Sequence, residues 1–142
     1  MNRSMIQRLF LFGFFLSIFF YSGAQDMEVT ITNIRNDKGV LMIGLFNSKE
    51  TFTKKIFKGE NPKASTGEVK VVFKNIPPGD YAVSVFHDEN SNGKIDTNFI
   101  GIPKEGFGFS NDAMGAFGPP SFEKAGVVVP KTKSVVMKLK YF

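Results

Sequence analysis

The chain has 142 residues, with 18 Lys or Arg, 13 Asp or Glu and 17 Phe, and it contains no Cys, no Trp and a single His. This length fits one domain, and the 42% hydrophobic and 22% charged content is that of a folded protein rather than a disordered one. The lack of Cys excludes disulfides, zinc–thiolate sites, Fe–S clusters and thiol nucleophiles, and one His excludes a His-rich metal centre.

The amino-terminal segment carries the pattern of a secretory signal peptide. Six Phe fall within residues 10–20, Arg3 and Arg8 precede this apolar run, and small residues follow it at 22–24. A basic start, a short apolar stretch and small residues before a cleavage site predict a signal peptide over residues 1–24. The apolar run is shorter than the about 20 residues that span a bilayer. We therefore expect export to the periplasm or the outside of the cell, without stable membrane insertion after cleavage.

The charge of the remaining chain predicts no nucleic-acid partner. Removal of the two Arg residues in 1–24 leaves 16 basic and 13 acidic residues in 25–142, a net charge of +3. The Lys residues are scattered, and no basic stripe with interleaved aromatic residues is found in the sequence. Nucleic-acid binding is therefore not expected.

The pattern of residues 25–142 predicts six or seven short strands separated by turns. Apolar residues alternate with polar ones, as in Val29 and Ile31 beside Thr30 and Thr32. The strands are expected in the segments 29–32, 40–46, 69–73, 81–86, 127–129 and 135–141. In 81–86 the alternation places Tyr81, Val83 and Val85 on one face and Ala82, Ser84 and Phe86 on the other. This spacing predicts an all-β fold, a single antiparallel two-sheet sandwich.

One long segment, residues 88–126, interrupts the rhythm of strands. It is rich in Gly and Pro and carries five aromatic residues: Phe99, Phe107, Phe109, Phe117 and Phe122. Structureless loops of this length are uncommon in compact domains and are usually functional or disordered. We expect the aromatic residues to pack this loop onto the sandwich, and we expect any working surface to lie here.

Residues 88–96 form the motif with the clearest chemistry. Oxygen-bearing side chains stand at relative positions 1, 3, 5 and 9, and a Gly stands at position 6, as in the first part of an EF-hand calcium loop. The predicted ligands of Ca²⁺ are the side chains of Asp88, Asn90, Asn92 and Asp96 and the backbone carbonyl of Lys94. Position 12 is Phe99 instead of Glu, so the usual bidentate ligand is missing and binding should be weak, at about 10⁻⁴–10⁻³ M.

A structural turn is the alternative interpretation of the same residues. Asn92-Gly93 is a strong hairpin signal, and Asp and Asn favour turns because their side chains bond nearby backbone. A third interpretation is a metal-dependent hydrolase with a transition metal at His87, Asp88 and Asp96. No nucleophile motif accompanies His87, so we expect a structural imidazole and no catalytic residues.

Several strings resemble one bacterial family. They are 33–36 with Gly39, the strand ending in Leu45-Phe46, Pro78–Ala82, His87–Asp96, Gly101–Ser110 and Pro120–Phe122. Together they resemble the exported family catalogued as domain of unknown function 2141. The strand pattern is also similar to transthyretin-like and carboxypeptidase-regulatory-like sandwiches. The resemblance implies an exported bacterial protein and brings no catalytic residues with it.

The sequence therefore predicts a noncatalytic exported β-sandwich, a binding or envelope-associated module whose partner is a protein or a small ligand. The alternative is a binder of small ligands or glycans that uses the 101–122 loop, with Phe107, Phe109 and Phe117 as aromatic faces. Exposure of these three rings distinguishes the two, because buried rings would serve only as loop core.

Overall fold

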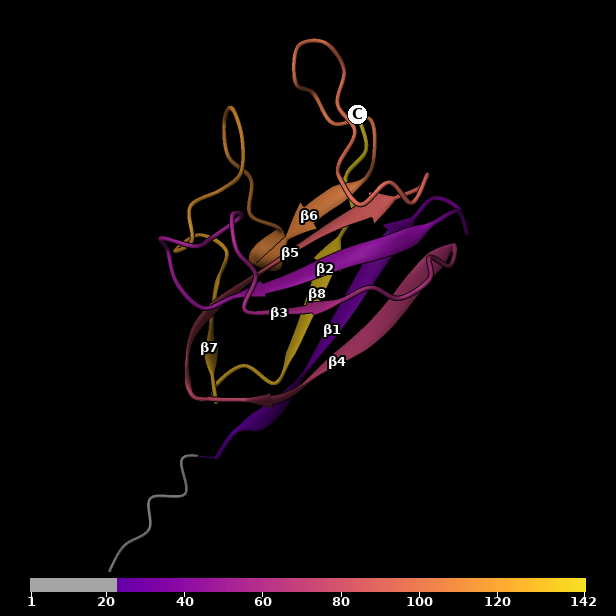
Figure 1. Ribbon diagram of the computed structural model, residues 1–142. Helices are drawn as coiled ribbons and strands as arrows, with labels where there is room; N and C mark the ends of the chain where they lie inside the picture. Colours follow the sequence, from indigo (N-terminus) through magenta and orange to yellow (C-terminus); the bar gives the residue numbers. More distant parts are fainter. Residues whose placement is uncertain (1–22) are drawn as a thin grey trace, which may run out of the picture.

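A computed structural model describes residues 23–142, so the predicted signal peptide lies almost wholly outside the described residues. The described chain forms eight strands and one short 3-10 helix (Figure 1): β1 (Gln25–Ile34), β2 (Val40–Phe46), β3 (Lys58–Glu60), β4 (Gly67–Ile76), β5 (Gly79–Asp88), β6 (Phe107–Phe109), η1 (Ser110–Asp112), β7 (Gly126–Val129) and β8 (Ser134–Lys138). In this part of the chain no helix is long and apolar enough to cross a membrane.

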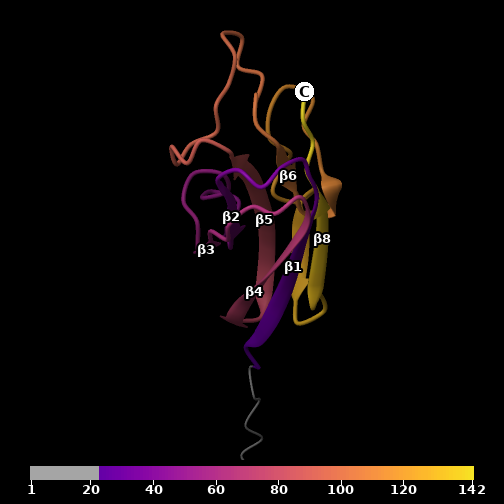
Figure 2. The same cartoon turned by 90° about the vertical axis from the view of Figure 1, so that its right-hand side faces the viewer.

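The strands form two sheets that face each other, which confirms the predicted sandwich (Figure 2). The three-stranded sheet has the order β4-β1-β8, and the larger sheet has the order β3-β2-β5-β6. Strand β7 also joins the larger sheet, since β6 and β7 pair with successive parts of β5. All pairs are antiparallel except β1 and β8, which run parallel from Glu28↔Ser134 to Thr32↔Lys138.

The core lies between the two sheets and follows the predicted alternation. Tyr81, Val83 and Val85 of β5 point inward and are buried, together with alternate residues of the other strands. These side chains are mostly β-branched or large and aliphatic, which suits a pleated, half-buried surface. The residues of β2 and β5 that alternate with these core residues therefore face outward from the larger sheet. This outer face holds the candidate site.

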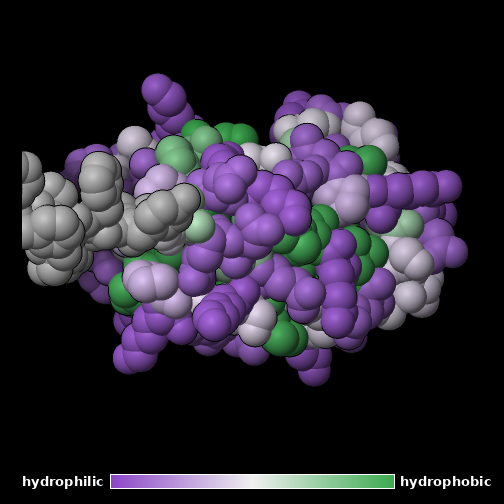
Figure 3. Space-filling view, turned by 90° about the horizontal axis from the view of Figure 1, so that it is seen from below, coloured by the Kyte–Doolittle hydropathy of each residue, from purple (hydrophilic) through white to green (hydrophobic). Residues whose placement is uncertain are grey.

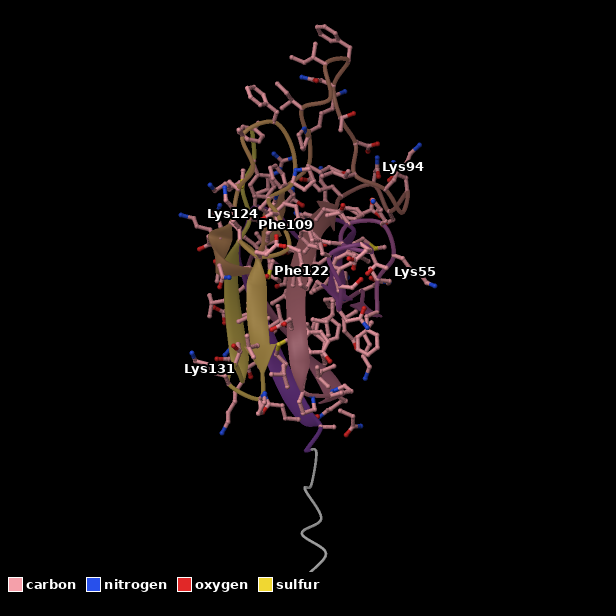
Figure 4. The ribbon with its side chains drawn as sticks, turned by 90° about the vertical axis from the view of Figure 1, so that its left-hand side faces the viewer. Lys55, Lys94, Phe109, Phe122, Lys124 and Lys131 are labelled. Carbon is pink, nitrogen blue, oxygen red and sulfur yellow. The ribbon has the colours of Figure 1, made fainter. Side chains whose placement is uncertain are left out.

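A second, smaller core covers part of that outer face. Phe46 and Ala82 from the sheet pack against Phe52, Phe109 and Ala125, with Phe122 at the edge. The ring of Phe52 lies 6.0 Å from that of Phe109 and 5.8 Å from that of Phe122, in edge-on contacts. Figure 4 shows Phe109 and Phe122 close together between the loops and the sheet. The prediction that loop aromatics pack onto the sandwich is confirmed for these two rings.

Two other aromatic residues of the long segment do not pack in this way. Phe99 and Phe117 are fully exposed, so the prediction that the aromatic residues pack this loop onto the sandwich was wrong for them. Both belong to loops that project beyond the body of the sandwich, where no further strand or helix is available to cover them (Figure 1).

Candidate functional site

Asp88, the last residue of β5, organises the predicted ion loop from a buried position. Its side chain is about 1% exposed, and its two carboxylate oxygens accept hydrogen bonds from the backbone N–H groups of Asn92 (3.0 Å) and Gly93 (2.8 Å). Gly93 has a φ of 79°, which Gly adopts without strain. The carboxylate therefore fixes a tight turn directly after the strand.

The remaining predicted side-chain ligands converge on Asp96. The side-chain amide of Asn90 donates to its carboxylate at 2.6 Å, and that of Asn92 donates at 3.0 and 3.2 Å. The structure thus brings Asn90, Asn92 and Asp96 together, while Asp88 bonds the backbone of the same loop. No group of three or more His, Asp or Glu that could hold a metal occurs within residues 23–142. Calcium binding stays a prediction.

Glu105 is a part of this site that the sequence did not single out. Its side chain is about 5% exposed, and its two oxygens accept hydrogen bonds of 2.9 Å from the backbone N–H groups of Glu89 and Asp96. Buried carboxylates are tolerated where such donors satisfy them. Glu105 lies nine residues beyond Asp96 in the chain, and no sequence spacing marks this contact.

Glu89 anchors the loop to the turn that precedes β2. Arg35 donates to its carboxylate at 2.7 Å and Asn36 donates at 3.2 Å. Partial burial opposes ionisation of Glu89, but the hydrogen bonds from Asn36 and Arg35 and the Arg35 charge outweigh it and lower the pKa of Glu89. The Arg35 guanidinium also lies 4.5 Å from the centre of the Tyr141 ring. A network of charge and ring contacts therefore joins three distant segments beneath the loop.

His87 is buried and bonded at the end of β5. The ring is fully buried, and its nitrogens lie 2.7 Å from the Lys38 carbonyl oxygen and 3.1 Å from the Tyr141 hydroxyl. Together with Asp88 and Asp96 it does not form a metal-holding group in the described chain.

Residues 96–104 form a hairpin that stands on this base. The backbone N–H of Lys104 donates to the Asp96 carbonyl at 2.8 Å, Thr97 bridges to Pro103, and the N–H of Asn98 donates to the Ile102 carbonyl at 2.8 Å. Glu105 contacts both ends of the 89–96 segment at the base of this hairpin. The predicted ion loop therefore supports the hairpin directly.

The hairpin forms one wall of an apolar groove on the outer face of the larger sheet. The groove has a volume of about 930 Å³, and residues 114–119 supply much of the opposite wall. Its floor consists of outward-facing residues of three adjacent strands: Met42, Gly44, Phe46, Ser84, Phe86 and Phe107. Volumes of about 300–1,000 Å³ are usual for small-molecule sites, which are mostly apolar with a few polar groups.

The three rings proposed as binding faces have different environments. Phe109 is buried in the small outer core, Phe107 is half-buried on the groove floor, and Phe117 is exposed on the wall. They do not form one exposed platform, as a glycan site of stacked rings would require. The groove instead extends from the surface of the sheet onto the loops. From the sequence, Ser84 and Phe86 of its floor were predicted only to share one face of a strand.

Comparisons with known proteins identify a family and nothing closer. The family model described as an uncharacterized protein conserved in bacteria matches residues 29–137. No curated protein and no solved structure matches the chain. The match covers both the groove floor and the loop at residues 88–105, so these features lie within the region that defines the family.

Proposed function

The chain belongs to the bacterial family designated DUF2141, and we propose that it is an exported, noncatalytic module that binds a small apolar ligand in the groove of the larger sheet. The observation that carries the proposal is the groove itself, a large apolar hollow on the outer face of a sheet whose inner face already supplies the core. An apolar face of this size left open to solvent marks an interaction site.

The chemistry of the lining supports binding without catalysis. The lining contains aliphatic and aromatic side chains, a few hydroxyl and amide groups and one Lys, and it contains no carboxylate side chain and no His. Contacts of this kind give affinity through burial of apolar area, at about 25 cal/mol per Å². Proton transfer between positioned groups, which general acid–base catalysis requires, has no evident donor and acceptor pair here.

The proposed export rests on the pattern of residues 1–24. We also propose that the loop at residues 88–96 supports the wall of the groove. Asp88 fixes the turn at Asn92 and Gly93 that leads into the 96–104 hairpin, and Glu105 fixes the first residue of that hairpin, Asp96. These contacts would keep the apolar wall over the sheet. Weak Ca²⁺ binding by Asp88, Asn90, Asn92, Lys94 and Asp96 remains part of this proposal and would further stiffen the same base.

Binding of the neutral apolar dye Nile red tests the proposed function. A saturable rise in fluorescence with one dye per chain is expected, and Ser84→Phe should abolish it by filling the floor. Val72→Phe is the matched control, because Val72 lies outside the groove on β4 and is partly exposed. Absence of saturable binding, or equal loss in both variants with both still folded by circular dichroism, would contradict the proposal.

A further inference from the structure

We propose that the ligand is an amphiphile with an alkyl chain and an anionic head group, and that Lys54 recognises the head. This inference rests on the proposed function of the groove and adds the chemical class of its occupant. It starts from the side chains that line the groove, among which a single one is charged.

Lys54 is the one charged side chain among the residues that line the groove. It lies in the connection between β2 and β3 and is exposed to solvent. Its ammonium group has no hydrogen-bond or ion-pair partner within residues 23–142, so its charge is available to a ligand. An unpaired cation at the edge of an apolar hollow is placed to receive an anion.

The rest of the groove selects an alkyl chain. The floor runs across Met42, Gly44, Ser84, Phe86 and Phe107 without a charged group, and an alkyl chain buried along it would gain affinity with each methylene. The end of the molecule away from the 96–104 hairpin has a mainly hydrophilic surface, with only scattered hydrophobic side chains (Figure 3). The groove thus offers a place where a hydrocarbon chain leaves water while its head group stays in water.

The two parts of such a ligand should contribute unequally. Each methylene buried adds about fourfold to affinity, from about 0.8 kcal/mol per buried CH₂. An exposed ion pair adds at most about fivefold and weakens with salt. Chain length therefore sets affinity, whereas Lys54 sets the preference among head groups. Because an ammonium is a point charge, carboxylate and sulfate heads should behave alike.

Displacement of Nile red from the purified protein at low salt separates these contributions. The competitors are dodecanoate, dodecyl sulfate, dodecanol and dodecylamine, each below its micelle-forming concentration. The unaltered protein should bind the two anions about two- to fivefold more tightly than dodecanol, and dodecylamine least tightly. Decanoate should bind more than tenfold more weakly than dodecanoate, because it lacks two methylenes.

A pair of neighbouring variants tests the role of Lys54. Lys54→Gln should remove the preference for anions, so that within this variant dodecanoate and dodecanol bind with about equal affinity. Lys55→Gln should keep the preference, because Lys55 shares the same turn, with both backbone N–H groups donating to the Thr51 carbonyl, but does not line the groove and points outward (Figure 4). Equal binding of all four heads, or an anion preference that survives in Lys54→Gln, would overturn the head-group assignment while leaving the groove established. Failure of every amphiphile and of the dye to bind would refute the proposed function itself.

Discussion

The Glu105 carboxylate accepts a 2.9 Å hydrogen bond from the backbone N–H of Asp96, and this contact joins the predicted ion loop to the wall of the groove. The other oxygen of Glu105 accepts from the backbone N–H of Glu89, so one buried side chain closes both ends of the 89–96 segment. The hairpin that follows is therefore held by polar contacts at its base, whereas apolar residues such as Ile100 and Ile102 line the groove.

Glu105→Ala should lower the free energy of unfolding by about 2–4 kcal/mol, because two backbone N–H groups lose their acceptor. It should also weaken dye binding in the groove, since the wall loses its support. Urea denaturation gives the first quantity and Nile red titration the second.

Glu123→Ala is the control for that variant. Glu123 is exposed and pairs with Lys49 on the surface, so its removal should change stability little and leave dye binding intact. Similar losses of stability in the two variants would argue against a special role for Glu105.

Gly39→Ala should be severely destabilising. Gly39 has a φ of 65°, and a Cβ there would overlap the carbonyl oxygen of Asp88, closer than real atoms approach. Gly67→Ala measures the cost of the positive φ alone, because Gly67 also has a positive φ but no other atom lies within 4 Å of the place a Cβ would take. In urea denaturation, Gly67→Ala should lower the free energy of unfolding by about 1–2 kcal/mol, and Gly39→Ala should lower it clearly more. Equal costs would mean that the turn can move away from Asp88.

Stability should depend on pH through Glu89. Its folded-state pKa lies below its ordinary value of 4.5, so the folded state binds fewer protons than the unfolded chain. The stabilisation from Glu89 is therefore present above about pH 4.5, the ordinary and thus unfolded value, and is lost as pH falls through the lowered pKa. Urea denaturation between pH 6 and pH 3 should show a smaller decline in Glu89→Gln than in the unaltered protein. Parallel declines would contradict this assignment.

Calcium should raise the melting temperature if the 88–96 loop binds it. At 100 times the dissociation constant the gain is about 2.7 kcal/mol, or roughly 4–8 °C for a domain near this size. The rise should saturate, should not be reproduced by magnesium and should disappear in Asp96→Ala. An unchanged melting temperature between EDTA and 10 mM calcium would leave the loop as a purely structural turn.

The strands that form the core could be predicted because inward and outward side chains alternate over many residues in each of them. Val83 and Val85 face inward between Ala82, Ser84 and Phe86, and only one face of β5 meets the other sheet. Strands β3 and β6 were not predicted, because three residues such as Lys58–Glu60 or Phe107–Phe109 carry no periodicity. The parallel pairing of β8 with β1 depends on how the sheets close, which no local pattern encodes.

The candidate site could be predicted only in part for a similar reason. Local spacing identifies Asp88, Asn90, Asn92 and Asp96 as one loop, and the structure brings the last three together. The contact of Glu105 with this loop and the groove above the sheet depend on the path of residues 95–119. Exposed Phe99 and Phe117 also show that aromatic content alone does not predict burial.

The most direct test of the central claim uses the four methionines of the described chain. Met42 and Met114 line the groove, whereas Met27 and Met137 are fully buried in the core between the sheets. A titration with dodecanol, followed by NMR of ¹³C-labelled methionine methyl groups, therefore reports on both places at once. Saturable shifts of the Met42 and Met114 signals, with Met27 and Met137 nearly unchanged, are the predicted result. Unchanged signals for Met42 and Met114, or shifts of equal size at all four residues, would contradict ligand binding in the groove.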